Sequence, residues 1–214
     1  MRRSLLLLML AGCATVRHGM DITQTGAPVL RERAQDVPAE EIQTPAFQAL
    51  IARMVDAMRA APGVGLAAPQ LSVSKRVFVI EDKDELMASL TPQERAERER
   101  VPVPLRVFVN PVVTPVGDEK VMFFEGCLSV NGFAGLVERW REVEVQALDE
   151  HAQAVVWRVR GWPARILQHE MDHLDGTLYI DRMVTRSFGT LPQVKALYSG
   201  KPIAEVKRLL GVTP

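Results

Sequence analysis

The sequence lacks most of the features that mark specialised protein classes. It contains only two cysteines in 214 residues, which excludes a disulfide framework as the basis of the fold. Its 26 basic and 26 acidic residues cancel to a net charge of zero, so no overall positive charge points to a nucleic-acid partner. No apolar run reaches the roughly 20 residues that a membrane-spanning helix needs. These absences leave a globular protein, as does the hydrophobic content of 47%.

The first nineteen residues differ in composition from the rest of the chain. Two arginines precede a short apolar run at residues 5–10, which ends in Leu-Ala-Gly-Cys at residues 10–13. This pattern is typical of a secretory signal, and its last four residues resemble the lipobox at which bacterial lipoproteins are acylated, here on Cys13. The alternative is that translation begins at Met20 and the start was assigned too far upstream. On either interpretation residues 1–19 lie outside the folded domain, and a membrane anchor depends on Cys13.

The remaining sequence predicts a mixture of helices and strands. A hydroxyl and a proline at Thr44-Pro45 start a helix with one apolar face, and Pro62-Gly63 ends it. A second helix begins near Pro163 and ends at about Leu174, before Gly176. Buried or alternating strands are predicted at residues 77–80, 107–109, 112–116, 143–147 and 155–159, the last two forming a hairpin. The predicted fold is α+β, with mainly antiparallel strands packed around the second helix.

Two segments do not fit regular elements. Residues 63–70, Gly-Val-Gly-Leu-Ala-Ala-Pro-Gln, predict a loop of small side chains. Residues 82–104 contain a dense run of charged side chains. Such a run is usually a solvated helix face or a flexible insert, and we interpret this segment in the same way.

The second helix carries a pattern with metal-binding chemistry. His169 and His173 are four residues apart, so both rings lie on one helix face and can reach one ion. Glu170 lies one step round the helix, where it can contact a metal-bound water without being a ligand. A catalytic site needs three protein ligands and an open position, and its metal makes water acidic enough to supply hydroxide. The bland alternative is a pair of surface histidines with a salt-bridging glutamate.

The third ligand distinguishes between classes of hydrolase. In metalloproteases of the metzincin type the third ligand is a histidine, and the matching position here is Tyr179. Other zinc proteases use a glutamate further along the chain as the third ligand, and no glutamate occurs here between Glu170 and Glu205. His151 lies in the predicted hairpin turn, where a solvated role is usual. Cys127, between Glu125-Gly126 and Leu128-Ser129, is ordinarily interpreted as a small buried hydrophobe. Its polar neighbours and the adjacent glycine favour a thiolate ligand, which gives one cysteine and two histidines.

Three motifs in order resemble those of the peptide deformylase family. They are residues 63–70, residues 125–129 (Glu-Gly-Cys-Leu-Ser) and residues 168–176 (Gln-His-Glu-Met-Asp-His-Leu-Asp-Gly), and residues 22–30 are similar to the family's first strand. The resemblance covers about residues 20–187, and residues 161–166 and 180–183 are similar to the organellar-type branch. It implies a catalytic domain at 20–187, followed by a C-terminal tail with a short helix at 188–214.

The resemblance also implies an activity, the removal of the formyl group from the initiator methionine of nascent polypeptides. Cys127, His169 and His173 would bind one divalent ion. The resemblance implies Fe²⁺, the usual metal of the family, with Zn²⁺, Ni²⁺ or Co²⁺ able to substitute. Glu170 would be the general base and acid, and Gln70 and the Leu128 backbone N–H would stabilise the oxyanion. The residues implied to hold the substrate are Gly65, Val64, Trp162 and Ile166.

The sequence departs from the family pattern at two positions. Ala134 stands where many bacterial members carry an arginine that holds the peptide, and Trp162 is bulky enough to narrow the methionine pocket.

The expected location is the cytoplasm, with transient ribosome association. The alternative functions are a metallopeptidase using the same helix and an inactive lipoprotein that binds formyl peptides.

Overall fold

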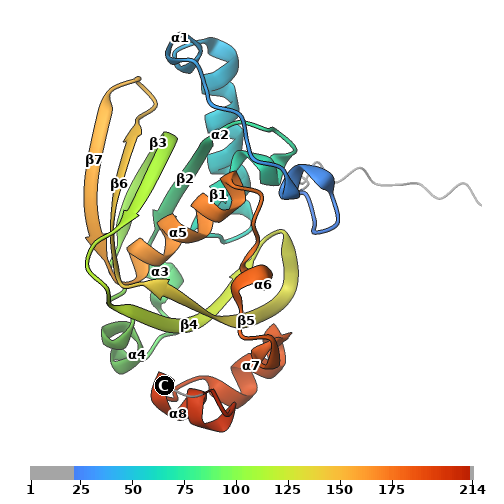
Figure 1. Ribbon diagram of the computed structural model, residues 1–214, viewed down its shortest axis with the longest axis vertical. Helices are drawn as coiled ribbons and strands as arrows, with labels where there is room; N and C mark the ends of the chain where they lie inside the picture. The colour runs from blue at the N-terminus through green and yellow to red at the C-terminus, as the bar shows by residue number, and fades with distance from the viewer. Residues whose placement is uncertain (1–21, 213–214) are drawn as a thin grey trace, which may run out of the picture.

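Two antiparallel sheets enclose one central helix (Figure 1). The computed structural model describes residues 22–212, so Cys13 and Met20 lie outside the described residues. The larger sheet has the order β1-β2-β3-β6-β7 and the smaller one β4-β5-β8. The strands are β1 Gly65–Ala67, β2 Val77–Asp82, β3 Val103–Pro115, β4 Lys120–Cys127, β5 Val130–Trp140, β6 Glu142–Leu148, β7 Ala154–Arg160 and β8 Gly189–Thr190. The predicted α+β class with mainly antiparallel strands is confirmed.

Both long helices begin and end close to the residues that the sequence predicts. Helix α2 (Pro45–Ala60) starts where the Thr44 hydroxyl accepts a hydrogen bond from the N–H of Phe47, at 3.3 Å. Helix α5 (Trp162–Leu174) follows Gly161, whose φ of 71° favours glycine. The shorter helices are α1 Ala39–Ile42, α3 Asp84–Met87, α4 Pro92–Glu97, α6 Tyr179–Arg182, α7 Leu191–Tyr198 and α8 Ile203–Leu209. None of the helices within residues 22–212 has the length and apolar character needed to cross a bilayer.

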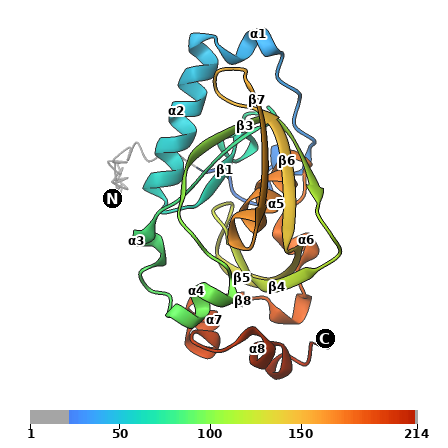
Figure 2. The ribbon, with the colours of Figure 1, turned by 90° about the vertical axis from the view of Figure 1, so that its left-hand side faces the viewer.

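Strand β2 of the larger sheet is buried on both faces, between α2 and α5 (Figure 2). Side chains alternate along β2, so Val77 and Val79 belong to the core on the α2 side, and Phe78 and Ile80 to the core on the α5 side. This explains why β2 is an apolar run without an alternating polar pattern. The layers place α5, with both histidines, in the middle of the molecule.

The predicted hairpin is confirmed, but the predicted loop at 63–70 is wrong. Strands β6 and β7 pair with Val145 opposite Trp157. Residues 65–67 form β1, which pairs with β2 at Leu66 and Val79, and residues 68–71 form a short 3₁₀ helix. Small side chains do not prevent strand pairing here, because the backbone N–H and C=O groups make the bonds and a neighbouring strand supplies the partners.

The charge run at 82–104 was interpreted as a solvated face or flexible insert, and that interpretation is wrong for several of its residues. Asp82 is 1% exposed and accepts two hydrogen bonds from Arg100, at 2.8 and 2.9 Å. The guanidinium groups of Arg98 and Arg100 lie 5.6 and 5.2 Å from the Trp162 ring centre. The segment forms α3 and α4 and packs onto the domain, because its arginines find buried carboxylate and aromatic partners.

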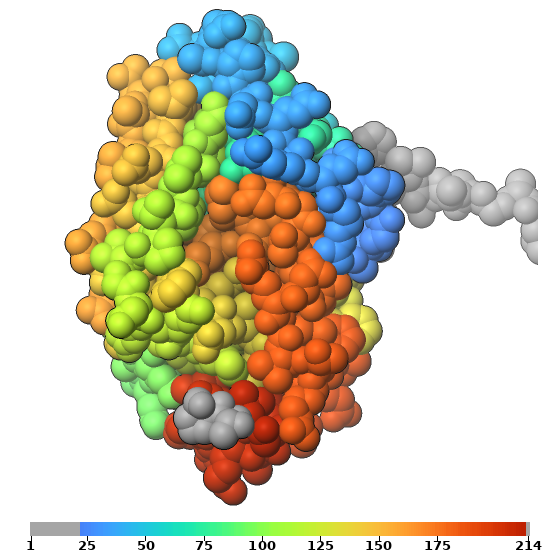
Figure 3. Space-filling model, viewed as in Figure 1, coloured from blue at the N-terminus to red at the C-terminus, as the bar shows by residue number. Residues whose placement is uncertain are grey.

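The C-terminal residues hold two helices, α7 and α8, where the sequence predicted one short helix. Both pack against the α3–α4 segment at one end of the molecule (Figure 3). Glu94 accepts hydrogen bonds from the N–H groups of Thr91, at 2.9 Å, and Gly200, at 3.0 Å. One buried carboxylate therefore caps α4 and ties it to residues 106 positions away.

We expect Glu94→Gln to lower the free energy of unfolding by about 1–2 kcal/mol at neutral pH. The N–H of Thr91, with a second bond from Gly200, holds the pKa of Glu94 below its ordinary value. This stabilisation is present above the ordinary glutamate pKa of about 4.3 and is lost as pH falls through the lower folded pKa. Urea unfolding should show that the free energies of unfolding of the wild type and the variant differ less at pH 3 than at pH 7. Exposed Glu85→Gln is the control, and an equal loss there would contradict the prediction.

Candidate active site around helix α5

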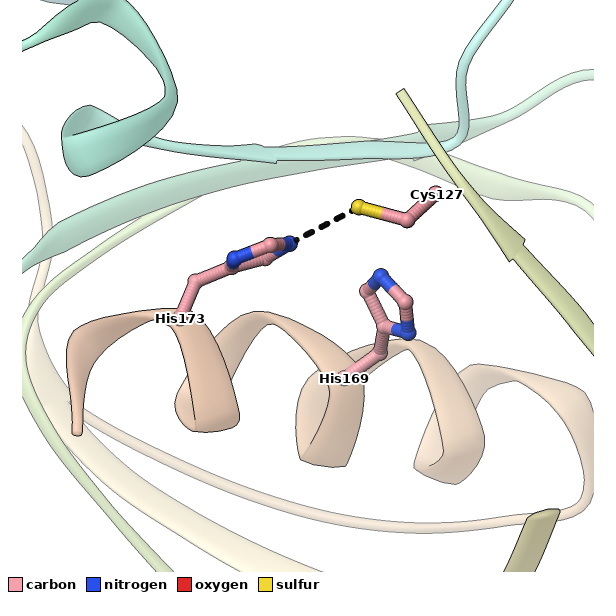
Figure 4. Close-up of side chains that lie close together, drawn as sticks. All are labelled: Cys127, His169 and His173. Atoms are coloured by element: carbon pink, nitrogen blue, oxygen red, sulfur yellow. Dashed lines mark hydrogen bonds between the residues drawn. The ribbon is translucent and has the colours of Figure 1, made fainter. Parts of the chain in front are cut away.

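One sulfur and two imidazole nitrogens converge between the sheets (Figure 4). Cys127 ends strand β4, and His169 and His173 lie one turn apart on α5. The ligating atoms of all three lie within 4.8 Å of one another, and Cys127 Sγ is 3.2 Å from His173 Nε2. The structure therefore brings Cys127 to two histidines that follow it by 42 and 46 positions in the sequence, as the motifs predict.

A glutamate fixes the orientation of His169. Its Nδ1–H donates to Glu125 Oε2 at 2.9 Å, which leaves Nε2 to face Cys127 and His173. Burial alone would raise the pKa of Glu125, but Arg139 beside it and its hydrogen bonds hold that pKa well below the usual range. Glu125 is therefore a carboxylate, and it can only accept the imidazole proton.

Two buried arginines complete this network, and sequence reasoning assigned them no role. Arg139 donates to both oxygens of Glu125, each at 2.9 Å, and Arg165 donates to Glu125 Oε1 at 2.6 Å. Arg139 also contacts Asp172, which in turn accepts from Arg182. All of these side chains except Arg182 are less than 10% exposed. A signal was available, since Arg165 precedes His169 by four residues on the same face of α5.

The Glu170 side chain is buried against strand β1. It is 3% exposed, and burial raises its pKa to about 7 although the nearby imidazoles act in the opposite direction. Its Oε2 has no hydrogen-bond partner among residues 22–212. Any side chain at Gly65 would overlap this carboxylate, so the glycine lets the two elements approach. A buried carboxylate with a free oxygen and a pKa near neutrality suits proton transfer.

The predicted oxyanion donors are also at the site. Gln70 is 2% exposed, and its Oε1 accepts from the Ala67 N–H at 2.9 Å, which fixes the orientation of the amide. Its Nε2 consequently points at Ser129 Oγ, at 3.2 Å, and Cys127 Sγ, at 3.7 Å. Leu128 directly follows Cys127, and no turn or loop hydrogen bond of the described residues uses its N–H.

The predicted methionine-pocket residues line one cavity beside Glu170. Val64, Trp162 and Ile166 bound a cavity of about 90 Å³, together with Phe124, Glu125, Gly126, Arg165, His169 and Glu170. Trp162 is held by the guanidinium groups around its ring and by an edge-on contact with Phe123, at 6.4 Å. Ala134 is buried and pairs with Gly189 of β8, so the strand beside it is covered by the C-terminal segment.

The donor set fits a divalent transition metal. Burial alone would raise the pKa of the Cys127 thiol, but His173 and His169 hold that pKa well below its ordinary value, which favours the thiolate form. Cys127 and Glu125 raise the pKa of His169 against the effect of burial, so the position favours positive charge. One thiolate and two imidazoles suit iron, nickel, cobalt or zinc and do not select among them. His151 is exposed and does not belong to this cluster, as expected of a turn residue.

Comparison with known proteins decides the family. The family model described as polypeptide deformylase matches residues 20–188. The chain belongs to the peptide deformylase family. Its relatives include peptide deformylase 1A, chloroplastic, of Solanum lycopersicum, which is 48% identical over 171 residues, or 80% of this chain and 62% of that protein. The mitochondrial peptide deformylase of Homo sapiens is 45% identical over 78% of this chain and 69% of its own length.

Solved structures support the same assignment. A Met-Ala-Ser-bound class I type b peptide deformylase from Acinetobacter baumannii superposes with a TM-score of 0.67 and is 33% identical, covering 76% of this chain and 96% of that one. The predicted resemblance to peptide deformylases, with organellar members among the similar proteins, is confirmed. The chain spans less than two thirds of the length of the tomato relative.

Proposed function

We propose that this member of the peptide deformylase family is a metal-dependent hydrolase. It would remove the N-formyl group from the initiator methionine of newly made polypeptides and release formate. The observation that carries the proposal is the meeting of Cys127 with both α5 histidines, next to the buried carboxylate of Glu170. One residue of strand β4 and three residues of helix α5 thus share one small volume.

Cys127, His169 and His173 would hold the ion. When bound, it would supply Lewis-acid activation of water and of the formyl carbonyl. Glu125 would keep His169 in the tautomer that leaves Nε2 free, because its carboxylate accepts the Nδ1 proton at 2.9 Å. The ferrous ion remains the prediction from the resemblance, since the ligands suit several metals.

Glu170 would move the proton in this hydrolysis. Water adds to the formyl carbon and gives its proton to Glu170, and the carbon–nitrogen bond then breaks. The proton passes from Glu170 to the leaving amine, so the products are formate and a free amino terminus. A pKa near 7 allows the same carboxyl to accept and to donate at neutral pH.

Gln70 and Leu128 would stabilise the negative charge that develops on the formyl oxygen. The Gln70 amide is held by Ala67, so its Nε2–H donors are in place before substrate arrives. The N–H of Leu128 would be the second donor, fixed by its position directly after Cys127.

The substrate chain would bind along β1 with its methionine in the small cavity. Strand β1 is the edge of the larger sheet, so Gly65 offers backbone groups to an added strand. Val64, Trp162 and Ile166 would contact the methionine side chain. Ribosome association and a cytoplasmic location remain predictions from the resemblance.

Formate release from formyl-Met-Ala-Ser tests the proposal. We expect activity from anaerobically purified, metal-loaded protein, loss on chelation and recovery when Fe²⁺ or Ni²⁺ is added back. Metal analysis should give one ion per chain, and Cys127→Ala should lose it. Absence of formate from the loaded protein would overturn the proposal. Cleavage of the peptide bond without formate would indicate a metallopeptidase.

A further inference from the structure

A second cavity, of about 310 Å³, adjoins the methionine cavity. The two share Phe124, Glu125 and Gly126, so they lie next to each other along strand β4. The second cavity is walled on one side by Leu90, Glu94 and Arg98 of the α3–α4 segment. On the other side it is walled by Leu191, Val194, Lys195 and Tyr198 of α7. We call this cavity the α4–α7 cavity.

The fold builds this cavity from segments far apart in the sequence. Pairing of Ala134 with Gly189 brings the C-terminal segment onto β5, and α7 begins two residues later. Tyr198 stacks on Phe124 with ring centres 5.4 Å apart, and Gly200 donates to Glu94. The cavity therefore has fixed walls, and it adjoins the cavity proposed for the methionine side chain.

Among the charged residues that line the cavity, one cation has no counter-ion within the part of the chain that the structure describes. Glu125 is neutralised by Arg139 and Arg165, as described above. Glu94 uses its oxygens on backbone N–H groups and is 3.8 Å from Arg98. The ion pair within the C-terminal segment joins Lys201 to Glu205, and Lys195 has no carboxylate partner within residues 22–212. The unbalanced charge is therefore positive, at the rim of the cavity.

We propose that the α4–α7 cavity is a subsite for an acidic side chain of the substrate polypeptide, downstream of the formyl-methionine. Lys195 supplies the charge that selects it, and Phe124 and Tyr198 form an apolar wall for the chain. The subsite acts as a specificity determinant and does not take part in the chemistry. This inference rests on the proposed deformylase activity, because the occupant is that enzyme's substrate.

The test measures kcat/KM on amidated formyl-Met-Ala-Ala-Ala peptides that carry Glu, Gln or Lys at the third or the fourth position. For the wild-type protein we expect the Glu peptide to exceed the Lys peptide by about two- to fivefold at one of these positions, the size of a solvent-accessible ion pair. The preference should fall as salt is raised, because mobile ions screen the charge. Lys195→Glu should reverse the order of the Glu and Lys peptides.

Lys207→Glu is the matched control, since Lys207 lies in α8 outside the cavity lining and the change in net charge is the same. It should keep the wild-type order. Equal kcat/KM across the series, with formate released, overturns the subsite alone. Reversal by Lys207→Glu as well would show a general field effect and also overturn it. If no peptide yields formate, the proposed deformylase function fails and the subsite with it.

Discussion

Glu170→Gln is expected to lower kcat/KM for formate release by about 10²- to 10⁴-fold while the bound metal is retained. Glutamine keeps the shape of the side chain against Gly65 but cannot accept and return a proton. The carboxylate is 3% exposed, and its Oε2 has no hydrogen-bond partner among the described residues, so little else should depend on its charge. The measurement is formate release together with metal analysis of the same preparation.

Glu138→Gln serves as the control for this prediction. Glu138 lies on β5 with half of its side chain exposed, and its partner is Lys120 at the surface. We expect its kinetics to match the wild type. Full activity in Glu170→Gln would exclude the assigned proton transfer. Loss of metal together with activity would show that Glu170 acts on the ligands and not on the substrate.

Glu125→Gln is expected to lower the free energy of unfolding by about 3–5 kcal/mol. Glu125 is the counter-ion of two buried arginines and also accepts the proton of His169. An amide cannot neutralise these cations, and its NH₂ group would face a guanidinium donor. Because a typical domain is stable by only about 5–15 kcal/mol, this is a large fraction of the total. Urea unfolding of metal-free protein gives the measurement without the contribution of metal binding.

The comparison variant is Glu81→Gln, which removes the partner of Arg59. That pair is also bidentate, but the Arg59 side chain is 44% exposed and water can replace the lost carboxylate. We expect a cost of about 1 kcal/mol or less there. If Glu125→Gln costs no more than Glu81→Gln, burial of the arginine network contributes little to stability and the prediction is wrong.

Local patterns in the sequence predicted the elements that depend on neighbours along the chain. Helix α5 follows from a glycine, a proline and an apolar face, and its period places His169 and His173 together. The β6–β7 hairpin follows from alternation around a short polar turn. Thr44 and Pro45 likewise fix the start of α2. These features require no knowledge of distant contacts.

Local patterns could not predict contacts between residues that are distant in the sequence. The charge run at 82–104 was interpreted as solvated, because nothing in it shows that Arg98 and Arg100 meet Trp162. The arginines around Glu125 come from β5 and α5. The spacing of Arg165 and His169 places Arg165 on the histidine face of α5, but it does not show that the partner is a carboxylate on β4. The hydrogen bond between Glu94 of α4 and Gly200, just after α7, joins residues 106 positions apart.

The sequence by itself determined the chemistry of the donors: two imidazoles one helical turn apart, a carboxylate beside them and a thiol between polar neighbours. Only the tertiary structure decided their environment. The packing of two sheets around α5 brings Cys127 to the histidines, buries Glu170 and surrounds Glu125 with positive charge. The physical reason is that helix periodicity is local, whereas burial and charge pairing depend on which distant segments exclude water from the same place.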